Sequence, residues 1–144
     1  MIGHSSSLKQ DIIIMFIIMI IAAIISGMNM WVNNINDVRI HLNDIYMGIL
    51  MTGWMFLLMG LFYSMNNYTI VGIITIIITT YLIRTQTFID ENQYLTSMIP
   101  HHSMAVFMSK KLKEKNIVNN DIINRLIDNI ILTQEQEIKI MKNN

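Results

Sequence analysis

The stretch IIIMFIIMIIAAII, Ile12–Ile25, decides the class of fold, because an uninterrupted apolar run of this length offers no polar face to water. Between Ile12 and Ile83, only Asp37, Arg39 and Asp44 carry a formal charge. A soluble domain needs polar residues on each outward face, whereas the hydrocarbon core of a bilayer excludes charge. The sequence therefore predicts an integral membrane domain over residues 1–84.

Three transmembrane helices are expected in this domain, over about residues 12–32, 45–65 and 68–84. About 20 residues at about 1.5 Å each cross a hydrocarbon core of roughly 30 Å. Trp31 suits the membrane interface at the end of the first span, and a polar loop over 33–44 follows it. The first span also allows an alternative, a cleaved signal peptide, although its apolar run is long and no A-x-A site follows.

Residues 85–144 are polar by comparison and predict two further helices. Asp90, with Gln93 three residues later, resembles a capping box that opens a helix running to about Lys115. Asn119 and Asn120 interrupt the chain, and apolar residues at spacings of three and four follow. The predicted fold is all-α, with a C-terminal antiparallel two-helix hairpin. Two helices make a thin core, so packing on another copy or on the membrane base is expected.

Composition excludes some classes of function. Ten basic and ten acidic residues give a net charge of zero, which argues against a nucleic-acid partner. The chain has no cysteine, so neither disulfides nor thiolate metal sites can form. Fourteen methionines in 144 residues are an unusually high share. Glu-x-x-His, His-Glu-x-x-His and Gly-rich phosphate motifs do not occur, and nothing in the sequence favours an enzyme.

The segment YLTSMIPHHSMAVFM, Tyr94–Met108, carries the strongest chemical pattern in the chain. On a helix, Met98, His101, Ala105 and Met108 share one face, Met104 lies near it, and His102 lies about 100° away from His101. Pro100 within this stretch predicts either a bend in the helix or its start. Several thioethers and two imidazoles therefore fall within about three helical turns.

The facing helix offers Gln134, Glu137 and Met141 to this cluster. Thioether and imidazole are soft, neutral ligands that suit Cu(I) or Ag(I) better than Mg, Ca or Mn. The competing interpretation is that the methionines fill a core and the histidines are structural. The candidate metal ligands are Met98, His101, His102, Met104 and Met108, with Gln134, Glu137 and Met141 as accessory groups.

A second methionine stripe runs along the second span at Met47, Met51, Met55 and Met59. Such a stripe can pass a soft cation through a copper-permeable oligomer, and loss of uptake into vesicles on replacing Met51 and Met55 by Leu would test that hypothesis. Packing against lipid or a neighbouring helix is the interpretation that we favour.

At two places the chain resembles the family catalogued as domain of unknown function 305, which includes CopM-like copper-binding proteins. One motif, M-I-P-H-H-x-x-A-x-x-M, is present from Met98 to Met108, and the other, Q-x-x-E-I-x-x-M, from Gln134 to Met141. The upstream part resembles membrane-anchored three-span bacterial members. Their L-N-x-x-Y-M motif is present at 42–47 and their R-x-Q-T motif at 84–87.

This resemblance implies a ferritin-like hairpin on the outer side of the cytoplasmic membrane, with copper or silver bound by Met and His. It also implies pairing between chains, because soluble members carry two repeats. We therefore expect a multi-pass membrane protein that binds a soft metal, forms a homo-oligomer and serves in metal buffering, tolerance or delivery. The alternatives are the copper-permeable oligomer and a non-catalytic interaction module whose histidines are structural.

Overall fold

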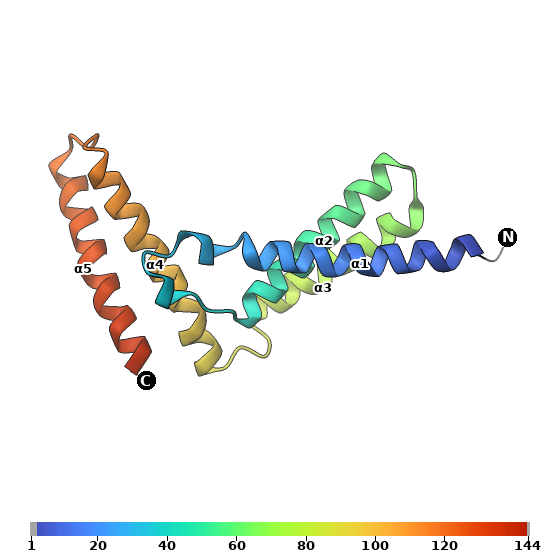
Figure 1. Ribbon diagram of the computed structural model, residues 1–144, viewed down its shortest axis with the longest axis horizontal. Coiled ribbons are helices and arrows are strands. Elements are labelled where there is room, and N and C mark those ends of the chain that lie inside the picture. Colours follow the sequence, from blue (N-terminus) through green and yellow to red (C-terminus); the bar gives the residue numbers. More distant parts are fainter. Residues whose placement is uncertain (1–2, 144) are drawn as a thin grey trace. The chain divides into compact units, whose positions relative to one another are not determined.

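The computed structural model describes residues 3–143, with side chains described from Ile13 onward, and this part of the chain contains helices and no strand (Figure 1). Because the elements are helical throughout these residues, the all-α prediction is confirmed. The helices are α1 (Gly3–Ile25), α2 (Leu42–Phe62), α3 (Asn66–Thr85), α4 (Glu91–Glu114) and α5 (Asp121–Asn143), with 3-10 turns η1 (Met28–Trp31) and η2 (Ile35–Asp37) between α1 and α2.

Three segments are long and apolar enough to cross a membrane, namely Ile13–Trp31, Leu42–Phe62 and Asn66–Thr85. The sequence predicted these three spans, but the second lies three residues earlier than expected. Its end is set by Ser64, whose φ of 55° is left-handed and stops the helix. The Met65 N–H then donates to the Gly60 carbonyl at 2.7 Å, which closes the end of α2.

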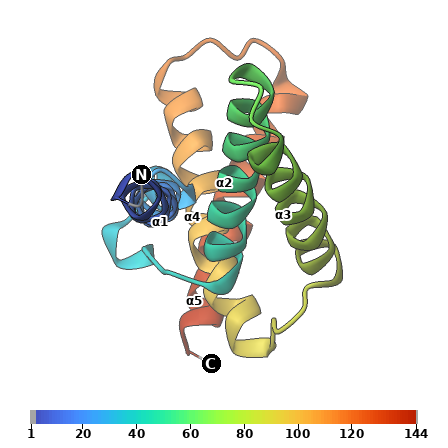
Figure 2. The same ribbon diagram turned by 90° about the vertical axis from the view of Figure 1, so that its right-hand side faces the viewer.

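Glycines allow α2 and α3 to approach closely, and Figure 2 shows the two helices side by side. A Cβ added at Gly72 would lie 2.8 Å from the Leu57 Cα, and one added at Gly60 would lie 2.9 Å from the Thr69 Cα. Small residues that bring helix backbones together are typical of membrane helix packing. The Tyr46 hydroxyl donates to the Thr87 carbonyl at 2.7 Å and so ties the start of α2 to the segment after α3.

Helices α4 and α5 run antiparallel and form the predicted hairpin (Figure 1). Asp90 caps α4 as the sequence predicted, since its side chain accepts from the Gln93 N–H at 2.7 Å. Asn120 accepts from the Ile122 N–H at 2.9 Å and caps α5. The small core between the two helices consists of Ile99, Val106 and Ile138, with Met141 packed against it.

Contacts divide the chain into two compact units. The first contains residues 1–25 and 42–88, and the second contains residues 26–41 and 89–144. Composition alone placed the boundary between residues 84 and 85. The packing differs in two respects, because the first unit extends to residue 88 and the loop that joins α1 to α2 groups with the hairpin. Contacts of η1 and η2 with α4 account for the grouping, and they include the edge-to-face pair of the Trp31 and Phe107 rings.

Candidate functional site

Helix α4 carries the His–Met segment in its interior. It begins at Glu91, nine residues before Pro100, and continues to Glu114. Pro100 therefore lies inside a helix and not at its start, which resolves the two alternatives left open by the sequence. Because proline has no N–H, the helix lacks one internal hydrogen bond just before the two histidines.

The two adjacent histidines have different surroundings. The side chain of His102 is 13% exposed and lies beside α5, whereas His101 is exposed to solvent. This difference follows from the 100° rotation between successive residues of a helix. Their ring centroids are 6.0 Å apart, and the ring planes are inclined at 58°.

His102 meets Glu137 of α5, one of the accessory residues that the sequence indicated. The His102 Nδ1 lies 3.0 Å from the Glu137 Oε2, within ion-pair distance. Burial lowers the pKa of His102 below its ordinary value, and repulsion from His101 acts in the same direction. Attraction to Glu137 opposes this shift without cancelling it. The imidazole is therefore held mainly neutral at pH 7, the form that binds metals.

The methionines of α4 differ in exposure. Met98 and Met104 are half-buried, and Met108 is 55% exposed. Since α4 is continuous, Met98, His101 and Met108 share a face as the sequence predicted, and Met104 lies one helical turn from His101.

The accessory residues of α5 are divided between two surroundings. Met141 packs against the core of Ile99, Val106 and Ile138, while Glu137 meets His102 and Gln134 is half-buried. Among the side chains described, from Ile13 to Asn143, no group of three or more His, Asp or Glu is placed to hold a metal ion.

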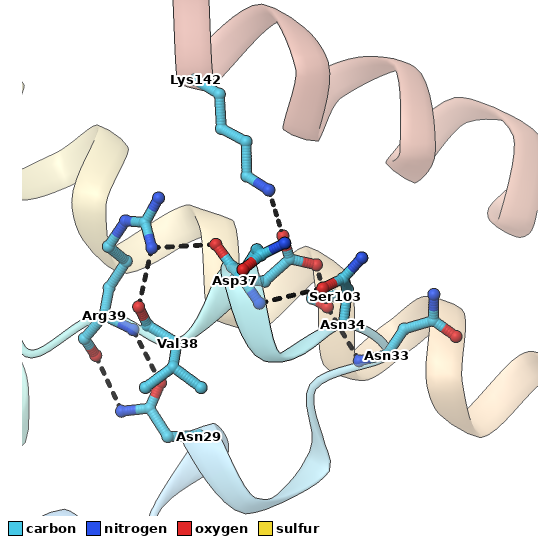
Figure 3. A network of polar contacts seen from close by, with 9 residues as sticks. Asn29, Asn33, Asn34, Asp37, Val38, Arg39, Ser103 and Lys142 are labelled. Carbon is cyan, nitrogen blue, oxygen red and sulfur yellow. Dashed lines mark hydrogen bonds and ion pairs between the residues drawn. The ribbon is translucent and has the colours of Figure 1, made fainter.

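Sequence reasoning missed a polar network on α4 that is centred on Ser103 (Figure 3). This side chain is 0% exposed. Its hydroxyl donates to the Asp37 Oδ2 at 2.5 Å and accepts from the Asn33 N–H at 2.8 Å. The Asp37 side chain is 6% exposed, and its second oxygen pairs with the Lys142 ammonium of α5. The signal available beforehand was Asp37 itself, one of three charges in a long apolar stretch.

The loop that supplies Asp37 is braced by its own contacts. Asn29 and Arg39 exchange two hydrogen bonds, from the Asn29 Nδ2 to the Arg39 carbonyl at 2.7 Å and from the Arg39 N–H to the Asn29 Oδ1 at 3.0 Å. The Arg39 guanidinium also donates to the carbonyls of Asn36 and Val38 (Figure 3). These bonds hold the loop in one conformation around Asp37.

The methionine stripe of α2 faces outward for half its length. Met47 and Met51 are 49% and 44% exposed, and Met55 and Met59 are half-buried. Outward-facing thioethers do not enclose a path within one chain. A methionine-lined passage would have to form between copies.

Comparison with known proteins identifies the family of the chain. The family described as Domain of unknown function (DUF305) matches residues 82–144, and the chain belongs to that family. Over 136 residues the chain is 43% identical to an uncharacterized protein of Acanthamoeba polyphaga mimivirus, with 88% of each chain covered. No solved structure matches.

Proposed function

We propose that this protein is a membrane-anchored binder of soft monovalent metal ions, Cu(I) or Ag(I), and that it serves in metal buffering, tolerance or delivery. The observation that carries the proposal is the separation of the two histidine rings. Imidazole nitrogens bind metals at about 2.0–2.1 Å, so two rings on one ion have centroids at most about 6.5 Å apart. The rings of His101 and His102 are 6.0 Å apart, within that limit.

The chemistry of the donors supports a soft ion. His102 is biased to the neutral form, and thioethers carry no proton, so binding to this set requires little deprotonation. Neutral nitrogen and sulfur donors favour Cu(I) over hard cations, which prefer carboxylates. Glu137 touches the Nδ1 of His102, and a carboxylate in that position orients an imidazole ligand. The ligands proposed are His101 and His102 with Met98, Met104 and Met108.

A second copy of the chain belongs to this proposal. His101 and Met108 are exposed, so a single hairpin leaves an ion open to water on one side. On α5, the large apolar residues Ile122, Leu126 and Leu132 are also exposed. Exposed apolar area on a thin hairpin favours association, and pairing would cover both the apolar area and the bound ion.

The test is a titration of the detergent-purified protein with Cu(I) against a competing chelator. The His101→Ala, His102→Ala double variant should lose binding and keep its helical circular dichroism, while Met98→Leu with Met104→Leu should weaken binding. Met30→Leu, at an exposed methionine outside the cluster, is the matched control and should bind as the wild type does. Equal affinity in the histidine double variant would refute the proposal.

The second candidate function is a membrane interaction module in which the histidines are structural. The contact between His102 and Glu137 favours it, because a half-buried imidazole beside a carboxylate also serves to join two helices. A folded protein with no affinity for Cu(I) would favour this second candidate function over metal binding.

A further inference from the structure

The polar network around Asp37 joins three segments of one unit, namely the loop between α1 and α2, helix α4 and helix α5 (Figure 3). One carboxylate oxygen of Asp37 accepts from the Ser103 hydroxyl of α4, and the other pairs with Lys142 of α5. The carboxylate therefore bridges the two helices of the hairpin from the loop side.

The two partners of Asp37 sit beside the two halves of the proposed metal site. Ser103 directly follows His102 on α4, and Lys142 directly follows Met141 on α5. On a neighbouring flank, His102 contacts Glu137 across the same pair of helices. The hairpin is thus connected twice at the level of the histidines, once directly between helices and once through the loop.

In the Asp37 bridge, the buried carboxylate is stable because each of its oxygens has a polar partner. A carboxylate that is 6% exposed is unfavourable unless it is paired, and here a hydroxyl and an ammonium satisfy it. The Asn33 N–H in turn donates to the Ser103 oxygen and extends the chain of bonds into the loop. Such a network has one low-energy arrangement, so it fixes the separation of the segments that it joins.

We infer that Asp37 is a positioning residue that sets the spacing of α4 and α5 at the His–Met site. The part of this inference that concerns metal affinity rests on the proposed function, whereas the part that concerns helix spacing does not. The loop that carries Asp37 connects α1 to α2 in the chain. Asp37 therefore connects the site, through the chain, to two helices that are apolar enough to span a membrane.

The spacing is testable without metal in the full chain, which has no native cysteine to remove before labelling. Spin labels at Tyr94→Cys on α4 and Gln136→Cys on α5, both exposed positions, report the distance between the helices by pulsed electron paramagnetic resonance. We expect one narrow distance distribution in the otherwise unmodified protein. Asp37→Asn and Lys142→Met should each broaden it, because each removes one charge of the bridge.

Two control variants separate this role from a general loss of ion pairs. Lys142→Arg keeps the positive charge and should therefore give the same narrow distance distribution as the otherwise unmodified protein. Lys113→Met removes an ion pair with Asp128 that joins the same two helices away from the loop, and it should leave the distribution unchanged. An unchanged distribution in both Asp37→Asn and Lys142→Met would overturn the inference about spacing.

The affinity measurement uses Cu(I) with the same variants. Loss of a group that positions metal ligands weakens metal binding by about 10–100-fold, and this is the effect expected for Asp37→Asn. If the wild type does not bind Cu(I), the proposed function fails while the distance measurement still decides the role of Asp37. Broadened distances with unchanged affinity would refute the positioning of the site.

Discussion

Removal of the Ser103 hydroxyl, a change of one heavy atom, should markedly destabilise the packing of the loop between α1 and α2 on α4. Ser103→Ala takes one hydrogen bond from the buried Asp37 carboxylate and leaves the Asn33 N–H without its acceptor. A hydrogen bond to a charged group contributes about 1.5–3 kcal/mol. Asn33 is exposed, so water can replace the acceptor that its N–H loses, and the change should destabilise the packing of the loop on α4 by about 1.5–3 kcal/mol.

Hydrogen exchange of the detergent-purified full chain measures this loss directly. When reclosing is faster than exchange, a loss of about 1.5–3 kcal/mol corresponds to roughly 10- to 150-fold faster exchange at the affected amides. The acceleration should appear at Asn33 and in the middle of α4, while the amides of α2 and α3 keep their rates because they belong to the other unit.

A matched serine on the same helix provides the control. Ser109 is half-buried, and Ser109→Ala should change stability by no more than about 0.5 kcal/mol. If Ser103→Ala exchanges no faster than Ser109→Ala, the network does not stabilise the loop, and the account of its energetics given above is wrong.

Two further predictions concern other parts of the molecule. Gly72→Ala should lower the melting temperature of the protein in detergent, since the new Cβ would meet the backbone of Leu57 and overpacking costs about 1–3 kcal/mol. Gly53→Ala should cost less because its neighbours, Thr75 and Ile76, present side chains that can adjust; equal losses would contradict this reasoning. The packing of α4 on α5 should weaken as pH falls below about 6.5, because burial lowers the pKa of His102 and the unfolded chain then takes up the proton more readily. Hydrogen exchange of α5 between pH 7.5 and 5.5 checks this, and a pH dependence that persists in His102→Gln would assign it to another group.

The membrane spans and the hairpin were predictable because each depends on composition and local spacing. Charge-free stretches of about 20 residues allow few alternatives in any chain. The cap at Asp90 was readable for the same reason, since donor and acceptor are three residues apart. The end of α2 was not, because it depends on the left-handed conformation of Ser64, which a serine rarely adopts.

The candidate site was predictable on α4 and only partly across the hairpin. Helical periodicity correctly placed Met98, His101 and Met108 on one face. It also indicated Glu137 and Met141 on the facing helix, but it gave no means of separating the residue that meets His102 from the one that joins the core. That distinction depends on how far the two helices are rotated about their own axes, which a single chain's periodicity does not define.

The hydrogen bond between Ser103 and Asp37 was the least predictable part of the site, because the two residues are separated by 66 positions in the chain. Nothing in their local sequence links them, since a loop carboxylate ordinarily faces water and a helix serine ordinarily bonds to its own backbone. The structure instead buries both, and this burial gives the loop its influence on the hairpin. Helix α4 is attached to α5 through His102 on one flank and through Ser103 and Asp37 on another, so His102 lies against α5 while His101 faces solvent. The adjacent histidines therefore differ in burial, and under the proposed function His102 would be the ligand held within the hairpin and His101 the ligand open to solvent.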